Sequence, residues 1–218
     1  MKLFRKRNNT TELVFIIDRS GSMNGFESDT IGGFNSMIEK QKSGDGEVLV
    51  TTVLFNNKSA RIHDRVSISK IQPMTKNEYQ AMGCTALLDA VGSTITHIDS
   101  IHRYARKYDV PAHTIFVITT DGMENASHFF NASQVKEMIT AKTEGSGWEF
   151  IFLGANIDSV EAANSIGIRS ERAANYMQTR EGYNACYEAM NEFVCQARSQ
   201  RMQACDESWK QKLADFDN

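Results

Sequence analysis

The sequence predicts an α/β fold: a doubly wound, mostly parallel central sheet with helices on both faces and one antiparallel edge strand. Apolar runs of strand length alternate with segments of helical period, which is the pattern of successive βα units. Two runs, Leu13 to Ile17 and Ile115 to Ile118, are apolar without a break. Unbroken apolar runs are typical of central parallel strands that are covered on both faces.

The first half of the chain supplies the edge of this sheet. After the strand that ends at Asp18, we expect a helix over 30–42, whose apolar stripe comprises Ile31, Phe34 and Ile38. Two further strands are expected over 48–55 and 60–66, and the turn-rich residues 56–59 between them predict a hairpin. The second strand alternates apolar and polar residues, which suits an edge strand with one wet face.

The second half continues the alternation without a repeat or a linker. Gly145 to Gly147 is a short glycine-rich stretch, which we interpret as a turn from a helix to a strand. We expect helices over 85–108, 133–142 and 181–198, a short helix capped by Asp158 or Ser159, and strands over 115–118, 148–153 and 168–174.

The length of 218 residues fits one large α/β domain. We assign residues 1–10 to a flexible basic N-terminal tail and residues 11–200 to the domain, which includes a closing C-terminal helix. Residues 201–218 are predicted to be a polar tail or an extension of that helix. The basic cluster in the N-terminal tail is followed by polar residues and not by the apolar stretch that a signal peptide requires.

The amino-acid composition argues against a nucleic-acid partner, a membrane-spanning segment and a zinc site. The net charge is −3 and the sequence pI is about 6.0, so there is no basic field to hold a nucleic acid. No apolar run is long enough to cross a membrane, and a cytoplasmic location is expected. The four cysteines form no CxxC pair, which disfavours a zinc site and favours reduced thiols.

Three oxygen-rich segments lie where the predicted winding would bring them together. They are Asp18-Arg19-Ser20-Gly21-Ser22 after the first strand, Gly83-Cys84-Thr85 before the long helix, and Thr120-Asp121-Gly122 after the strand at 115–118. In an open α/β sheet, the binding crevice lies at the carboxyl ends of the strands where the strand order reverses. At least two of the three segments should open into that crevice.

These segments have the chemistry of a Mg²⁺ or Mn²⁺ site. Such a hard ion takes oxygen ligands in an octahedron and keeps some water. Asp18 and Asp121 would supply two negative charges, and the hydroxyls of Ser20, Ser22 and Thr85 would supply neutral oxygens. With only two carboxylates beside it, the ion would stay electrophilic toward a carboxylate from outside.

The pattern Asp18-x-Ser20-x-Ser22, then Thr85, then Asp121-Gly122 resembles the metal-ion-dependent adhesion site (MIDAS) of von Willebrand factor type A (vWA) domains. The resemblance covers about residues 13–167 and is greatest to small stand-alone bacterial or phage members. It implies the Rossmann-like vWA fold, a divalent cation on all five residues, and a partner protein whose Glu or Asp completes the coordination. It also implies a monomer or one part of a larger complex.

Structural roles compete with the metal hypothesis at single positions. Thr85 could be only a helix N-cap, and the serines could satisfy a glycine-rich turn. Asp18 and Asp121 are harder to explain in this way, because carboxylates placed directly after buried strands need a cation or dedicated donors. Weaker candidates for the surroundings of the site, for which solvation, helix capping or surface exposure are the alternatives, are Glu27, Asp29, Glu124, His128, Asn156 and Asp158.

An enzyme would place different residues in these loops. A haloacid dehalogenase-like phosphatase would have Asp-x-Asp after the first strand, and Ser20 stands at the second of those positions. The sequence also contains no phosphate-binding P-loop and no Gly-x-Ser-x-Gly elbow. We therefore expect a non-enzymatic, metal-dependent protein-interaction module. The alternatives are a Mg²⁺-dependent phosphoester hydrolase and a scaffold or phage component that does not use the metal.

Overall fold

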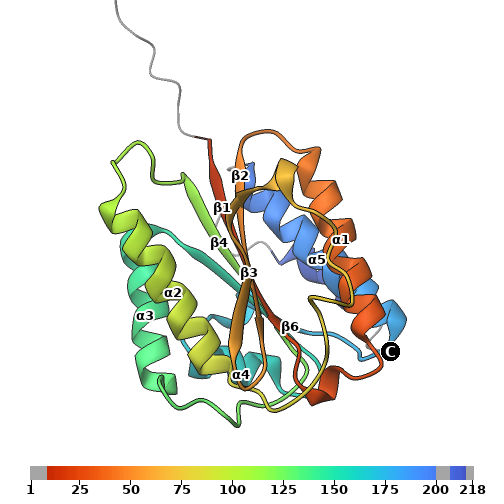
Figure 1. Ribbon diagram of the computed structural model, residues 1–218. Helices are drawn as coiled ribbons and strands as arrows, with labels where there is room; N and C mark the ends of the chain where they lie inside the picture. Colours follow the sequence, from red (N-terminus) through yellow and green to blue (C-terminus); the bar gives the residue numbers. More distant parts are fainter. Residues whose placement is uncertain (1–8, 200–206, 215–218) are drawn as a thin grey trace, which may run out of the picture.

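The computed structural model describes residues 9–199 and 207–214. Its centre is a six-stranded sheet with the order β3-β2-β1-β4-β5-β6 (Figure 1). The strands are β1 (Thr11–Asp18), β2 (Val48–Phe55), β3 (Ser59–Ser67), β4 (His113–Thr120), β5 (Glu149–Gly154) and β6 (Ala173–Asn175). Every neighbouring pair is parallel except β2 and β3. The predicted fold class, with its antiparallel edge strand, is confirmed.

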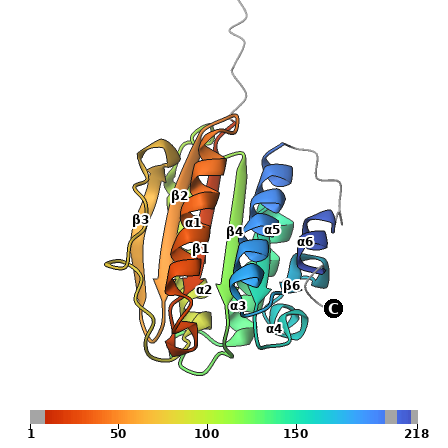
Figure 2. The ribbon, with the colours of Figure 1, turned by 90° about the vertical axis from the view of Figure 1, so that its right-hand side faces the viewer.

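Helices cover both faces of the sheet (Figures 1 and 2). One face carries α1 (Glu27–Lys42), α5 (Arg180–Arg198) and α6 (Gln211–Ala214), and the other carries α2 (Leu87–Tyr104), α3 (Ala132–Ser146) and α4 (Ser159–Ser165). Along β1, Leu13, Phe15 and Ile17 pack in the first core, whereas Val14 and Ile16 pack in the second. The unbroken apolar run is therefore explained by a strand that has a core on each face.

Local sequence signals set several helix ends. Asn131 and Gln134 form a capping box at the start of α3, and Gly147 ends that helix in the left-handed region with φ 65°. Asp158 caps α4 by accepting a hydrogen bond from the Glu161 N–H at 2.9 Å. Short 3-10 turns complete the fold at η1 (Gly21–Met23), η2 (Ile68–Lys70), η3 (Ser170–Arg172) and η4 (Ser208–Lys210).

Some predicted boundaries were wrong. Helix α1 begins three residues before Thr30, at Glu27, while α2 is shorter than residues 85–108 at both ends. The early part of the predicted last strand is loop and η3, because only Ala173–Asn175 pairs with β5. Periodicity locates helices well but cannot separate a final turn from an adjoining loop.

The described part of the C-terminal segment folds back onto the domain. Trp209 in η4 is fully buried and lies edge-on to Phe193 of α5, with ring centroids 5.6 Å apart. Of the two predictions for this segment, a polar tail or an extension of the closing helix, the polar tail does not describe residues 207–214, because Trp209 anchors them in the core. Residues 1–8, 200–206 and 215–218, on which the predicted N-terminal tail and the rest of the C-terminal tail fall, lie outside the described residues. No helix within the described ranges is both long and apolar enough to cross a membrane.

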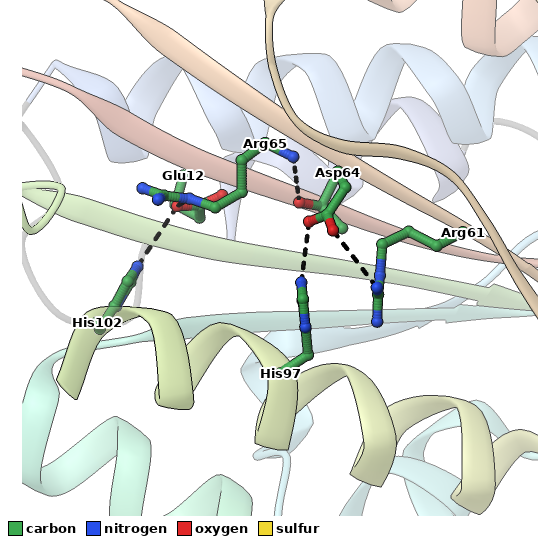
Figure 3. Close-up of polar contacts among 7 residues, drawn as sticks. Glu12, Arg61, Asp64, Arg65, His97 and His102 are labelled. Carbon is green, nitrogen blue, oxygen red and sulfur yellow. Dashed lines mark hydrogen bonds and ion pairs between the residues drawn. The ribbon is translucent and has the colours of Figure 1, made fainter. Parts of the chain in front are cut away.

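A buried ion pair between Glu12 and Arg65 lies near the start of β1 (Figure 3). Asp18 is at the opposite end of this strand. Glu12 is fully buried and accepts a hydrogen bond from Arg65 Nε at 2.7 Å, and His102 of α2 lies 3.4 Å from the same carboxylate oxygen. Arg65 has a positive φ of 52° in a part of β3 where the register shifts. This irregularity turns the Arg65 side chain from the edge strand toward the centre of the sheet.

Candidate metal centre

Asp18 and Asp121 lie at the carboxyl edge of two neighbouring strands. Asp18 is the last residue of β1, and Asp121 directly follows β4, which pairs with β1 in parallel. Strand order reverses here, because the chain goes from β1 to β2 on one side and later returns to β4 on the other. The two aspartates therefore lie at the crevice where α/β sheets bind ligands. The carboxyl ends of β1 and β4 are at the lower edge of the sheet in Figure 1.

Backbone hydrogen bonds join the three oxygen-rich segments. The Gly21 N–H donates to the Gly83 carbonyl at 2.9 Å, which connects the first and second segments. The Thr85 N–H donates to Asn125 Oδ1 at 2.9 Å, and the Asn125 N–H returns a bond to the Thr85 carbonyl at 3.0 Å. The segment that follows Asp121 is thereby fixed to the segment that carries Thr85.

Side-chain hydrogen bonds connect four of the five predicted ligands. The Ser20 N–H donates to Asp18 Oδ1 and the Thr120 hydroxyl donates to Asp18 Oδ2, both at 2.7 Å. The hydroxyls of Ser20 and Ser22 are 3.0 Å apart, and the Ser22 hydroxyl also donates to Asp121 Oδ1. The bond between Ser22 and Asp121 joins residues 99 positions apart, so two distant segments form one continuous hydrogen-bonded group.

The fifth predicted ligand, Thr85, lies near the same group, beside Gly122. A Cβ built on Gly122 would lie 3.3 Å from both Ser22 Oγ and Thr85 Oγ1, so both hydroxyls border this glycine. Thr85 is also not an N-cap, since α2 begins at Leu87 with Ala86 at the cap position and no side-chain cap bond. That structural alternative for Thr85 is wrong.

Both carboxylates are buried, and this shifts their protonation. Burial raises the pKa of Asp18 from 3.8 to about 6, although hydrogen bonds from Thr120 and Ser20 oppose the shift. Burial likewise raises the pKa of Asp121 above its ordinary value, against the hydrogen bonds from Ser22 and Gln178. Two adjacent buried carboxylates with raised pKa values form a site in which a cation would relieve an electrostatic cost.

The donor set fits a hard divalent cation. The five side chains offer only carboxylate and hydroxyl oxygens, the ligands that Mg²⁺ and Mn²⁺ prefer. Across residues 9–199 and 207–214, no group of three or more His, Cys, Asp or Glu side chains is arranged to hold a metal. A metal here would therefore depend on the serine and threonine hydroxyls as well as on the two aspartates. Four of the five side chains are buried and only Ser22 is exposed, so the group opens to solvent beside Ser22.

The weaker candidates have other roles in the structure. Glu124 accepts the N–H groups of Leu88, Ala126 and Ser127, and thereby fixes the loop after Asp121 against the start of α2. Asp158 is a helix cap, and His128 is exposed. Glu27 accepts the Gly25 N–H, Asp29 pairs with Arg180 at 3.5 Å, and Asn156 donates to Gln178.

One residue of the site was missed by sequence reasoning. Gln178 Nε2 donates to Asp121 Oδ2 at 2.8 Å and to the Ser22 carbonyl at 3.0 Å, so it joins two of the segments. It lies three residues beyond the end of β6, on the carboxyl edge of the sheet. The rule that points to Asp18 and Asp121, a polar residue at the end of a strand, does not find Gln178, because Tyr176 and Met177 separate it from the end of β6.

Gly122→Ala is expected to weaken metal binding without unfolding the protein. The new methyl group would press on Ser22 Oγ and Thr85 Oγ1 at 3.3 Å, while the backbone of Gly122 needs no left-handed conformation. We expect the affinity for Mn²⁺, measured by calorimetry, to fall by about 10- to 100-fold, the size typical of changes that displace metal ligands. Gly145→Ala, where a Cβ meets nothing within 4 Å, is the matched control. Equal affinities in the two variants would show that Ser22 and Thr85 do not converge on the ion.

Comparison with known proteins places the fold. No protein-family profile and no curated protein matches the chain in sequence. Solved structures do match in shape. The von Willebrand factor type A protein from Catenulispora acidiphila has 12% identity and a TM-score of 0.57, over 87% of this chain and 42% of that one. Manganese-loaded TRAP protein from Plasmodium vivax has 17% identity and a TM-score of 0.55, over 78% and 69%.

A third structure is proximal thread matrix protein 1 from the mussel byssus with a zinc-occupied MIDAS motif. It has 13% identity and a TM-score of 0.57, over 85% of this chain and 46% of that one. The chain thus spans less than half the length of two of these three proteins. With its sheet order and these similarities together, the chain has the fold of a von Willebrand factor type A domain.

Proposed function

We propose that this chain is a metal-dependent protein-interaction module. In this proposal Asp18, Ser20, Ser22, Thr85 and Asp121 hold a Mg²⁺ or Mn²⁺ ion, and an acidic side chain of a partner protein completes the coordination. The observation that carries the proposal is the convergence of two buried carboxylates and three hydroxyls from three chain-distant segments.

The balance of charge between the ion and its two aspartates favours a site that binds a partner over a closed structural site. Two aspartates offset the charge of a divalent ion. There is no third carboxylate among the five ligands, and a third one would lower the affinity of the bound ion for an external anion. The bound ion would supply Lewis acidity toward such an anion. This chain's residues would fix the ion's position, because Thr120, Gln178 and the Ser20 N–H already orient both carboxylates.

The comparisons support a metal at this place in the fold. The TRAP structure is manganese-loaded and the mussel structure has a zinc-occupied MIDAS motif. By analogy, the same edge of this sheet would hold a divalent cation, with the five residues above as its ligands. The activities of those longer proteins as wholes are not part of the proposal.

Chelation is expected to abolish partner binding. A pull-down from the native host in Mg²⁺ and in EDTA would identify the proteins lost on chelation, and the affinity of one purified partner would then be measured. We expect EDTA and Asp121→Ala each to remove binding, and readdition of Mg²⁺ to restore it only in the wild type. Unchanged affinity in EDTA would show that the ion is not the bridge. Hydrolysis of p-nitrophenyl phosphate that depends on Asp18 would instead favour the rival hydrolase.

A further inference from the structure

An apolar cavity of about 320 Å³ lies beside the proposed metal centre. It is enclosed by the start of α2, the loop between β4 and α3, and helix α4, which lie together at the lower edge of Figure 1. Its lining is mainly apolar and includes Leu87, Leu88, Met123, Ile157 and Ile166. This volume is within the range of ligand-binding pockets, which is about 300 to 1,000 Å³.

The cavity and the metal centre share a wall. Gly122 lines the cavity, and it also borders the Ser22 and Thr85 hydroxyls. Leu87, another lining residue, is only two positions after Thr85. A partner segment that reaches the metal would therefore lie next to the cavity.

Exposed methionines surround the same group of oxygens. Met82 is 54% exposed just before the segment with Thr85, and Met123 is 74% exposed just after Gly122. Met177 is 43% exposed and adjoins Gln178, the residue that contacts Asp121. Large exposed apolar side chains that gather around one site mark a binding surface, and methionine adapts to partners of different shape.

The polar groups of the cavity exclude an acidic occupant. Glu124 and Asp158 already accept backbone hydrogen bonds there, and the side chain of Glu161 adds a third carboxylate at an exposed position. A second carboxylate from the partner would be repelled. An apolar side chain, by contrast, would bury its surface against the leucine and isoleucine walls.

The cavity is preformed by its own loop. Asp89 of α2 accepts the N–H groups of His128, Phe129 and Phe130, each at 2.8 Å, and Glu124 holds the residues before them. A wall fixed in this way loses little conformational entropy when a side chain enters.

We infer that the partner presents two neighbouring features: an acidic residue for the metal and, within about four residues of an extended segment, a large apolar side chain for this cavity. The apolar residue is Leu, Ile, Met or Phe. This inference rests on the proposed function. The partner's acidic residue binds the metal, and the cavity selects partners by the apolar residue next to that acid.

Selection of peptides on the immobilised protein tests the inference. A random peptide library is bound to the protein in the presence of Mg²⁺ and eluted with EDTA. Only peptides whose binding depends on the metal are therefore recovered and sequenced. The same selection is run on Ala162→Phe and Ser165→Phe, which place a ring in the cavity from successive turns of α4. Val160→Phe adds the same ring on α4 at an exposed position outside the cavity lining and is the matched control. Mg²⁺ uptake by calorimetry reports on the metal centre of each variant.

The wild type and Val160→Phe are expected to select an Asp or Glu together with a nearby large apolar residue. In a selected peptide, changing the apolar residue to Ala should weaken binding about 10-fold, the effect of burying one such side chain. The two cavity variants should keep the acid and lose the apolar preference and the 10-fold difference. The inference would be overturned if the peptides selected by the wild type carried an acidic residue without an apolar neighbour, or if both cavity variants still selected the apolar residue. Either result would leave the proposed function standing. Elution of no acidic peptide by EDTA would overturn the proposed function itself.

Discussion

Asp18→Asn is expected to stabilise the metal-free protein and to abolish its binding of Mg²⁺. Asp18 is fully buried, and burial raises its pKa to about 6, so at pH 7 the ionised carboxylate opposes folding. Asparagine has the same shape and keeps an oxygen for the Ser20 N–H. Its amide group can donate to Thr120 Oγ1, whose own hydrogen can turn to the Gly122 carbonyl at 3.0 Å. The variant therefore removes a buried charge and keeps a partner for the Ser20 N–H and for the Thr120 hydroxyl.

The size of this gain depends on pH in a defined direction. The pKa of Asp18 is higher in the folded protein than its ordinary value of 3.8, so the folded state binds this proton more tightly. The stability that the proton contributes is fully present below about pH 4 and is lost as the pH rises through about 6. In EDTA, we expect Asp18→Asn to exceed the wild type by about 2 to 3 kcal/mol at pH 7, and by little at pH 4.

Urea denaturation in EDTA at several pH values measures this difference, and calorimetry with Mg²⁺ measures the accompanying loss of affinity, expected to exceed about 100-fold. Asp109→Asn, in an exposed pair with Arg106, is the control and should change the stability by less than about 0.5 kcal/mol. A residue that only stabilises a turn would behave in the opposite way, and its loss would weaken the metal-free protein. Wild-type stability that rises with Mg²⁺ while the variant's does not would place the ion on Asp18.

Sequence alone predicted the sheet and the positions of Asp18 and Asp121 at one edge of it, because both follow from short-range patterns. Strands covered on both faces contain unbroken apolar runs. Asp18 directly follows the first of these runs, and Asp121 directly follows the strand that contains the second. Parallel winding then puts both residues at one edge of the sheet. The sheet and the placement of the two aspartates follow from local sequence and from the handedness of the strand–helix–strand connections. Neither requires knowledge of individual contacts.

The contacts that sequence reasoning missed are those between distant segments with no motif of their own. Gln178 reaches Asp121 only because β6 ends where it does, and Trp209 reaches Phe193 only because η4 packs against α5. Glu12 is an acid at the start of a buried strand, and its partners are far along the chain in β3 and α2. No period or spacing identifies such partners, since each depends on the packing of complete elements.

Glu12→Gln is expected to lower the free energy of unfolding by about 3 kcal/mol, the usual effect of removing one partner from a buried ion pair. Glu12 has no exposed side-chain surface, and the Arg65 side chain is 23% exposed. Without the carboxylate, the Arg65 guanidinium would remain largely buried and uncompensated beside His102. Asp64→Asn is the matched control from the same region, because its pairs with His97 and Arg61 are about half exposed and should contribute less than about 1 kcal/mol (Figure 3).

The cause can be separated from simple loss of packing by a double variant. If the cost of Glu12→Gln is an unpaired charge, then Glu12→Leu with Arg65→Met should recover most of the stability, since buried pairs replaced by apolar residues are often neutral. Urea denaturation of the single and double variants gives the coupling between the two positions. Losses that simply add would mean that Glu12 and Arg65 act independently. Because this pair lies at the opposite end of β1 from Asp18, neither variant should alter Mg²⁺ affinity, which separates the stability of the sheet from the function of its carboxyl edge.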